Sequence, residues 1–155
     1  AEELEIYQAI NSFPGSGRRF EKLAENLYSD YGHHPIEIQA TLQMAKELSN
    51  DVVLVYQPHQ NVRQYEIIDQ YTDDIFRDAN EIYWLPTYLT RENPDLPTLT
   101  PQQLAKNIDK EKVHFAELDD NLWQEITAAR NSGKLVLCMG AGTIDGWIRE
   151  QLAKN

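Results

Sequence analysis

Short apolar runs alternate along this chain with segments of helical period, and this alternation restricts the fold more than any other feature. Apolar runs that are typical of buried strands lie at residues 27–28, 52–56, 81–85, 135–139 and, more weakly, 113–116. Between them, apolar residues recur at helical spacing over about 35–48, 62–76 and 121–130. Strands that alternate with helices indicate βαβ units. We therefore predict an α/β, Rossmann-like three-layer domain, with a mostly parallel sheet of about five or six strands flanked by helices.

Residues at several segment starts are typical of helix N-termini. Pro35 suits a first helical turn, because its φ is fixed and it lacks a donor that this turn would leave unpaired. Thr100-Pro101-Gln102-Gln103 resembles a capping box that opens a short helix through Leu104 and Ile108.

The residues expected to face the core from the three longer helices are Ile38, Leu42, Ala45 and Leu48, then Val62, Ile68, Ile75 and Phe76, then Leu122, Trp123 and Ile126.

Other residues indicate where the remaining helices and loops begin and end. Asp119 or Asp120 can cap the 121–130 helix, and Gly133 suits the left-handed residue that follows such a helix. The segment 86–101, with four prolines, is expected to be an exposed loop. For the first 25 or so residues we predict a helix, a turn and an edge strand.

Length and charge exclude several classes of protein. A chain of 155 residues fits one domain of ordinary size. Twenty-five acidic residues against fourteen Lys and Arg give a formal charge of −11, which argues against a general affinity for nucleic acid or for anionic membranes. No apolar stretch approaches the roughly 20 residues of a membrane span, and the acidic start does not resemble a signal peptide. We expect a cytoplasmic location, and we expect the single cysteine, Cys138, to be a core residue.

The most informative stretch is residues 29–35, Ser-Asp-Tyr-Gly-His-His-Pro. It places a carboxylate, a phenol and two imidazoles between an expected strand and an expected helix, and open α/β sheets bind ligands at such strand ends. Asp30, Tyr31, His33 and His34 are therefore candidate functional residues. The alternative is that the two histidines form an ordinary polar turn.

A second cluster follows the 52–56 strand, where Gln-Pro-His-Gln-Asn-Val-Arg spans residues 57–63. The guanidinium of Arg63 suits a carboxylate ligand because it donates in pairs, and the exposed amides of a helix start add to the attraction for anions. His59 is the other candidate in this cluster. The alternative is that Arg63 pairs with Glu66 or Asp69 on its own helix.

Two further clusters are weaker signals. In Met139-Gly140-Ala141-Gly142-Thr143, the glycines let backbone amides approach a ligand closely, so Gly142 is a candidate substrate contact, and Thr143 can cap the next helix. In residues 17–21, Gly-Arg-Arg-Phe-Glu, two cations could neutralise phosphate or form salt bridges with some of the many acids. Because parallel strands end at one edge, we expect the four clusters to lie together.

Several catalytic signatures are missing from the sequence. It has no lysine-bearing P-loop, no Cys or His cluster with metal-ligand spacing and no serine nucleophile elbow. We therefore expect no metal ligand in this chain, and we expect that a complete catalytic apparatus is absent.

Read in order, these clusters resemble the C-terminal domain of the Mur ligase family. Within it, the closest resemblance is to the MurC type, which joins L-alanine to UDP-N-acetylmuramate. The resemblance covers nearly the whole chain, and its middle motifs, Ser29 to Ile38 and Gln57-Pro58-His59 with Arg63, are the specific ones. It implies that two further domains, one for the UDP-sugar and a central one with an ATP-binding P-loop and magnesium ligands, precede this domain in the enzyme.

The resemblance also implies a reaction and its partners. ATP phosphorylates the carboxylate of UDP-N-acetylmuramate, and the amine of L-alanine attacks the acyl phosphate to form an amide. ATP and Mg²⁺ would serve the full enzyme and would not be held tightly by this domain alone. No nucleic acid or membrane is implied as a partner, and we expect the isolated domain to be inactive.

The resemblance gives each candidate residue a role. Arg19 and Asp30 would contact the ribose and phosphate region of ATP, Tyr31 and His33 would line the nucleotide side, and His34 would face the reacting centre. The substrate contacts would be His59 and Arg63, which hold the alanine carboxylate, and Gly142.

One position departs from the family pattern. Many ligases of this type carry Arg or Thr directly after the histidine of Gln-Pro-His, where this chain has Gln60. Arg63 is then the sole guanidinium of the carboxylate clamp, and the amino-acid specificity stays open. The alternatives are the recycling ligase that joins a tripeptide to the same sugar, a stand-alone nucleotide-binding or small-molecule-binding module, and a purely structural α/β domain.

Overall fold

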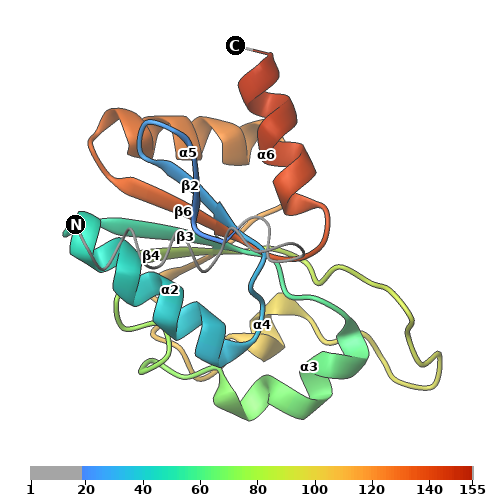
Figure 1. The fold of residues 1–155 in the computed structure, drawn as a ribbon. Coiled ribbons are helices and arrows are strands. Elements are labelled where there is room, and N and C mark those ends of the chain that lie inside the picture. Colours follow the sequence, from blue (N-terminus) through green and yellow to red (C-terminus); the bar gives the residue numbers. More distant parts are fainter. Residues whose placement is uncertain (1–18, 155) are drawn as a thin grey trace.

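A six-stranded sheet in the order β1-β2-β6-β3-β4-β5 forms the centre of the computed structural model, which describes residues 19–154 (Figure 1). Only β1 is antiparallel to its neighbour. The strands are β1 (Glu21–Ala24), β2 (Leu27–Asp30), β3 (Val52–Tyr56), β4 (Glu81–Trp84), β5 (Val113–Phe115) and β6 (Leu135–Met139). The helices are α2 (Pro35–Leu48), α3 (Asn61–Ile67), the 3₁₀ helix η1 (Ile68–Gln70), α4 (Pro101–Leu104), α5 (Asp120–Asn131) and α6 (Ile144–Ala153).

Helices cover both faces of this sheet. Figure 1 shows α2, α3 and α4 on one face and α5 and α6 on the other. Each face has its own apolar core, and every residue of β3 and β6 is buried. These two strands therefore read as continuous apolar runs, as expected for parallel strands that are covered on both sides. The predicted α/β three-layer fold is confirmed.

Most predicted elements are confirmed. The strands lie where the apolar runs predicted them, although β2 continues to Asp30 and β4 and β5 each end one residue earlier than expected. α2 has the predicted bounds, with Pro35 in its first turn. Asp119 caps α5 by accepting from the amide of Leu122, and Gly133 beyond it has a φ of 86°.

The predicted helix over 62–76 is wrong in its length and in its buried face. α3 ends at Ile67, η1 follows, and Phe76 reaches the core from a turn. The buried residues of α3 are Asn61, Gln64 and Ile67, whereas Val62 is only partly buried. The apolar pattern missed this face because two of its three residues are polar and are satisfied by hydrogen bonds to other segments.

Smaller predictions were also wrong. Leu48 at the end of α2 is exposed, and α4 ends at Leu104, so Ile108 is buried in a turn rather than in a helix.

The edge strand predicted near the start of the chain is confirmed as β1. The helix and turn predicted before it, with Gly17 and Arg18, lie outside the described residues.

Cys138 is fully buried in β6, as predicted, and burial raises the pKa of its thiol to about 12. A thiol of this kind is protonated near neutral pH and is a packing residue. Within residues 19–154, no helix is both long enough and apolar enough to span a bilayer.

Three neighbouring strands are followed by helices that lie on opposite faces of the sheet. The chain leaves β2 and β3 toward α2 and α3 on one face, and it leaves β6 toward α6 on the other (Figure 1). Because β6 lies between β2 and β3, the connections diverge at its carboxyl end. Such points are where open α/β sheets form ligand crevices.

The burial assigned to the core on the α2 face of the sheet can be tested by substitution. Leu137 is fully buried in β6, so Leu137→Ala is expected to lower the free energy of unfolding by about 2–5 kcal/mol, since it leaves a cavity between packed layers. Leu89→Ala, at an exposed leucine, is the control and should change it by less than about 0.5 kcal/mol. Urea unfolding measures both, and equal effects would contradict the assigned burial.

Candidate functional site

The loops that follow β2, β3 and β6 meet at the carboxyl edge of the sheet. Asp30, Met139 and Tyr56 lie level in adjacent strands. Just beyond them, the amide of Gly140 donates to the carbonyl of Asp30 at 3.1 Å and the amide of Gln57 donates to the carbonyl of Met139 at 2.9 Å. The structure therefore brings together three of the four predicted clusters, and the fourth joins them through Arg19.

The carboxylate of Asp30 is fully buried and bound to backbone amides. Its Oδ2 accepts from the amide of Phe20 at 2.8 Å, and its Oδ1 accepts from the amide of Gly32 at 2.7 Å. Burial raises the pKa of Asp30 above its usual value, although both amides and the nearby Arg19 oppose this. Asp30 thus fixes the start of β1 against the loop after β2. Its contact with ATP stays a prediction.

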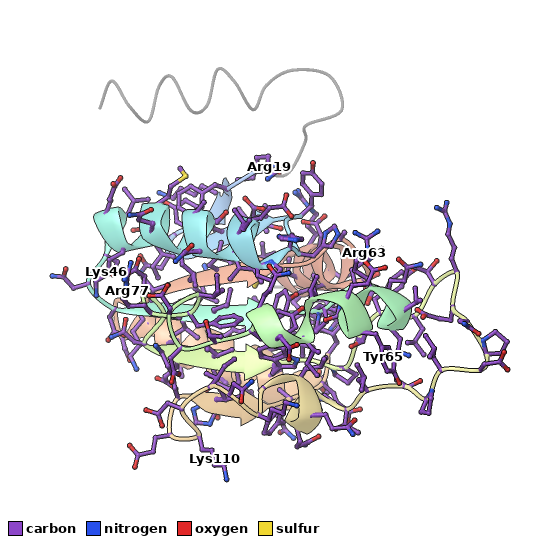
Figure 2. The ribbon with its side chains drawn as sticks, turned by 90° about the horizontal axis from the view of Figure 1, so that it is seen from below. Arg19, Lys46, Arg63, Tyr65, Arg77 and Lys110 are labelled. Carbon is purple, nitrogen blue, oxygen red and sulfur yellow. The ribbon has the colours of Figure 1, made fainter. Side chains whose placement is uncertain are left out.

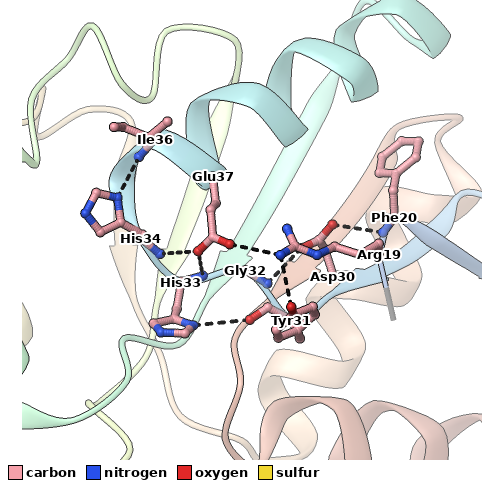
Figure 3. A network of polar contacts seen from close by, with 9 residues as sticks. All are labelled: Arg19, Phe20, Asp30, Tyr31, Gly32, His33, His34, Ile36 and Glu37. Atoms are coloured by element: carbon pink, nitrogen blue, oxygen red, sulfur yellow. Dashed lines mark hydrogen bonds and ion pairs between the residues drawn. The ribbon is translucent and has the colours of Figure 1, made fainter. Parts of the chain in front are cut away.

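Glu37 organises the loop that carries the two histidines (Figure 3). Its Oε1 accepts from the amides of His33 and His34 at 3.2 and 3.0 Å, and its Oε2 lies 3.2 Å from Nη2 of Arg19. Burial raises the pKa of Glu37, but the two amides and Arg19 outweigh it and hold that pKa below its ordinary value. Arg19 also donates to the hydroxyl of Tyr31 at 3.0 Å and lies over its ring.

His34 is the N-cap of α2. Its Nδ1 accepts from the amide of Ile36 at 3.2 Å, and together with Glu37 it forms a capping box (Figure 3). A capping role is therefore established for this imidazole, while its place at a reacting centre stays a prediction.

The imidazoles of His33 and His59 lie side by side across the β2 and β3 loops, with ring centroids 5.0 Å apart. His59 also stacks on Tyr88, with ring centroids 5.4 Å apart. The pKa of His59 is lowered from its ordinary value, mainly by burial and then by the nearby His33 and Arg63. A neutral imidazole is able both to accept and to donate a hydrogen bond.

Gly142 is needed for packing within the chain. A Cβ at this position would lie 2.5 Å from Cγ of Tyr88 and 2.8 Å from Oε1 of Gln57. Thr143 occupies the N-cap of α6, as predicted, but its side chain caps no amide. Instead, Gln57 accepts from the amide of Ile144 at 3.1 Å and donates to Oγ1 of Thr143 at 2.9 Å. The predicted substrate contact of Gly142 is not tested by this packing.

Arg63 lies on the outer surface at the start of α3 (Figure 2), where its side chain is half exposed and its Nε is 3.5 Å from Oε2 of Glu66. This is the pairing that the sequence left open as an alternative. The first amides of α3 already have an acceptor, because the carboxylate of Glu92 binds the amides of Asn61 and Val62 at 2.9 and 3.0 Å. The carboxylate of Glu92 therefore takes the place at these amides where a ligand anion was expected.

Three site residues were missed by the sequence reasoning. Glu37 stands three residues after His34, so the capping-box spacing could have identified it. Tyr88 and Glu92 belong to the proline-rich segment and meet His59 and α3 across about thirty residues, and no local pattern indicates such contacts. Among the described residues, no group of three or more His, Cys, Asp and Glu side chains could hold a metal ion.

A cavity of about 470 Å³ opens beside this edge on the α5 and α6 side. It lies between the loop after β4 and the start of α5, and its lining includes Gln57, Thr87, Tyr88, Asp119 and Thr143. Tyr88 thus lines this cavity and also stacks on His59.

The role of Glu37 can be tested through pH. Because its pKa in the folded state lies below its ordinary value of 4.5, ionised Glu37 stabilises the fold above that pH, and the contribution is lost as pH falls through the lowered pKa. Glu37→Gln is expected to cost about 1 kcal/mol of unfolding free energy at pH 7. The difference from the parent chain should shrink below pH 4.5, as followed by urea unfolding at several pH values. Glu66→Gln, at an exposed ion pair, is the control.

Two glycines only four residues apart provide a matched pair of variants. Gly142→Ala places a methyl group against Tyr88 and should cost about 1–3 kcal/mol. Gly146→Ala, within α6, meets no atom within 4 Å and should stabilise the chain by about 0.5–1 kcal/mol, since alanine favours helix. Thermal and urea unfolding measure both. Two variants of equal stability would show that Tyr88 does not fill the space at Gly142.

Comparisons with known proteins agree with this architecture. The UDP-N-acetylmuramate:L-alanine ligase of Rickettsia massiliae (strain Mtu5) is 37% identical over 158 residues, a match that covers 94% of this chain and 32% of that protein. The chain therefore spans about a third of the length of the curated relatives it matches.

Solved structures show the same fold. The UDP-N-acetylmuramate-alanine ligase of Thermotoga maritima aligns with a TM-score of 0.61 at 21% identity, over 97% of this chain and 35% of that one. A murein peptide ligase from Psychrobacter arcticus 273-4 aligns with a TM-score of 0.62 at 20% identity, over 94% and 31%. Residues 18–142 match the family model described as Mur ligase, glutamate ligase domain. This chain belongs to that family.

Proposed function

We propose that this chain is the C-terminal domain of an ATP-dependent ligase that joins L-alanine to UDP-N-acetylmuramate in peptidoglycan synthesis. The observation that carries the proposal is the 37% identity, over 94% of this chain, to ligases of that name. The convergence of the predicted clusters at one edge of the sheet supports it. The UDP-sugar-binding and ATP-hydrolysing domains would lie in the remaining two thirds of the enzyme, and we place the reaction in the cytoplasm.

In the proposed reaction, the carboxylate of the muramyl group attacks the terminal phosphorus of ATP, and ADP leaves. The amine of L-alanine then attacks the acyl phosphate, an amide bond forms and phosphate is released. Bringing a separate amine and an acyl phosphate into alignment can contribute roughly 7–11 kcal/mol to such a step. We propose that this domain supplies alignment rather than the phosphoryl-transfer machinery. We assign none of its residues to Mg²⁺, and no step of the proposal uses a metal held here.

The positions of the two guanidinium groups support separate roles for them. Arg19 lies over the ring of Tyr31 at the β2 side of the edge. There we propose that Arg19 and Asp30 contact the ribose and phosphate region of ATP and that Tyr31 and His33 line the nucleotide side. Arg63 and His59 lie at the β3 side, where we propose that they hold the carboxylate of the incoming amino acid. His34 caps the helix between these groups, and we propose that its exposed edge faces the reacting centre.

The test of this function is amide formation by the full-length ligase that contains this domain, followed as phosphate release with UDP-N-acetylmuramate, ATP and L-alanine. Release that depends on L-alanine would support the proposal. Release with a tripeptide in place of alanine would assign the protein to the recycling ligases. No release with any amino acid or peptide, from folded enzyme, would favour a binding module.

Arg63→Ala tests the carboxylate clamp. Hydrogen bonds to a charged group contribute about 1.5–3 kcal/mol, so kcat/KM for alanine should fall by about 10-fold to 150-fold while the KM for ATP changes little. Arg77→Ala is the matched control, because Arg77 also forms an exposed ion pair with an acid three residues away but lies on the opposite side of the view in Figure 2. Equal activity of the two variants would remove Arg63 from the clamp.

A further inference from the structure

Three buried polar side chains lie beneath the two histidine loops. Tyr56 is the last residue of β3, Tyr71 follows η1, and Gln64 lies on the inner face of α3. All three are fully buried, and Tyr56 and Tyr71 belong to the apolar core on the α2 face of the sheet. The backbone of Tyr56 belongs to the edge described above, but none of the three side chains is among the candidate site residues.

These side chains form a continuous chain of contacts between two backbone carbonyls. Oη of Tyr56 lies 2.8 Å from the carbonyl oxygen of His33 and 2.7 Å from Oη of Tyr71. Oη of Tyr71 lies 2.6 Å from Oε1 of Gln64, whose Nε2 donates to the carbonyl oxygen of His59 at 3.1 Å. The chain therefore joins the loop of one imidazole to the loop of the other.

The orientation of Gln64 and the protonation of both phenols follow from their surroundings. The amide nitrogen of Gln64 faces two carbonyl oxygens, those of His59 and Gln60, and an oxygen there would be repelled by both. Burial raises the pKa of Tyr56 and of Tyr71, so both phenols are neutral and each carries one proton.

Between the carbonyl oxygen of His33 and Oε1 of Gln64 there are three oxygen–oxygen contacts, and only two phenolic protons to fill them. The proton of Tyr56 can go to His33 or to Tyr71, and the proton of Tyr71 can go to Gln64 or to Tyr56. Whichever two bonds form, the third contact has no proton. Because two bare oxygens repel each other at this distance, the bond to the carbonyl of His33 competes with the bond to Oε1 of Gln64. An amide that accepts a stronger bond at its oxygen donates more strongly from its nitrogen, so this competition reaches the carbonyl of His59 through Gln64.

We propose that Tyr56, Tyr71 and Gln64 are positioning residues that couple the anchoring of the His33 loop to the anchoring of the His59 loop. A stronger hold on one carbonyl weakens the hold on the other. If the nucleotide contacts lie in the first loop and the amino-acid contacts in the second, as the proposed function has it, binding at one loop is felt at the other. This last step rests on the proposed function, whereas the coupling itself does not.

Gln64→Met tests the coupling because it keeps the length of the side chain but removes its amide. The direct loss is the bond to the carbonyl of His59. In addition, Tyr71 loses its acceptor and turns its proton to Tyr56, which then donates fully to the carbonyl of His33. One substitution should therefore loosen one loop and tighten the other.

The measurement is the backbone carbonyl ¹³C resonance of His33 and of His59 in this chain, since such a resonance moves downfield when its oxygen accepts a stronger hydrogen bond. In Gln64→Met we expect the His59 resonance to move upfield and the His33 resonance to move downfield. A general loosening of the fold would instead move both upfield. An unmoved His33 resonance, or two upfield shifts, would overturn the proposal.

Two more variants make the test independent of any one substitution. Tyr56→Phe should give the reciprocal result, because Tyr71 can then donate only to Gln64: the His33 resonance should move upfield and the His59 resonance downfield. Tyr71→Phe interrupts the series of hydrogen bonds in the middle. Adding Gln64→Met to Tyr71→Phe should therefore move the His59 resonance alone. Tyr83→Phe, whose hydroxyl donates to Glu125 away from this chain of contacts, is the control and should move neither resonance. These results need no ligase activity, so they stand or fall separately from the proposed function.

Discussion

The parallel pairing of β6 between β2 and β3 is the constraint on which the rest of the structure depends. It sets Asp30, Met139 and Tyr56 level, so that three loops begin at the same height and their backbones bond directly to one another. A shift of one residue in either register would turn every side chain of that strand to the opposite face. The place of the two imidazoles, of Gln57 and of Gly142 is therefore fixed by apolar strands that carry no chemistry of their own.

The sequence was sufficient where a signal is local or periodic. Val52–Tyr56 and Leu135–Met139 are apolar without interruption because both of their faces are covered, and Pro35, Thr100 and Asp119 mark helix starts by their own chemistry. α3 was misread because its inner face is polar. The amide of Asn61 is satisfied by Pro97 and Leu99 and that of Gln64 by Tyr71 and His59, and partners of this kind cannot be recognised from hydropathy.

For the candidate site, the sequence predicted which residues gather but not what holds them. The proline-rich segment was expected to be a plain loop, yet it supplies Tyr88, which fills the space at Gly142 and stacks on His59, and Glu92, which binds the first amides of α3. Gly142 in Gly140-Ala141-Gly142 is accounted for by this aromatic ring without any ligand. A glycine pattern after a strand therefore has two explanations, and only the tertiary contact distinguishes them.

The charged groups at this edge of the sheet differ in how firmly other groups of the chain bind them. Asp30, Glu37 and Glu92 each bind two or more backbone amides, so their charges hold loops in place and are balanced within the chain. The guanidinium of Arg19 is committed in part to Glu37 and Tyr31, and its side chain is only 25% exposed. Arg63 differs, because its side chain is 51% exposed and it pairs with an exposed acid on the same helix. Such pairs contribute about 0.3–0.5 kcal/mol, so exchanging Glu66 for a ligand carboxylate would cost the fold little. In a chain with a formal charge of −11, Arg63 is therefore the described cation at this edge best suited to exchange its partner for an anionic ligand.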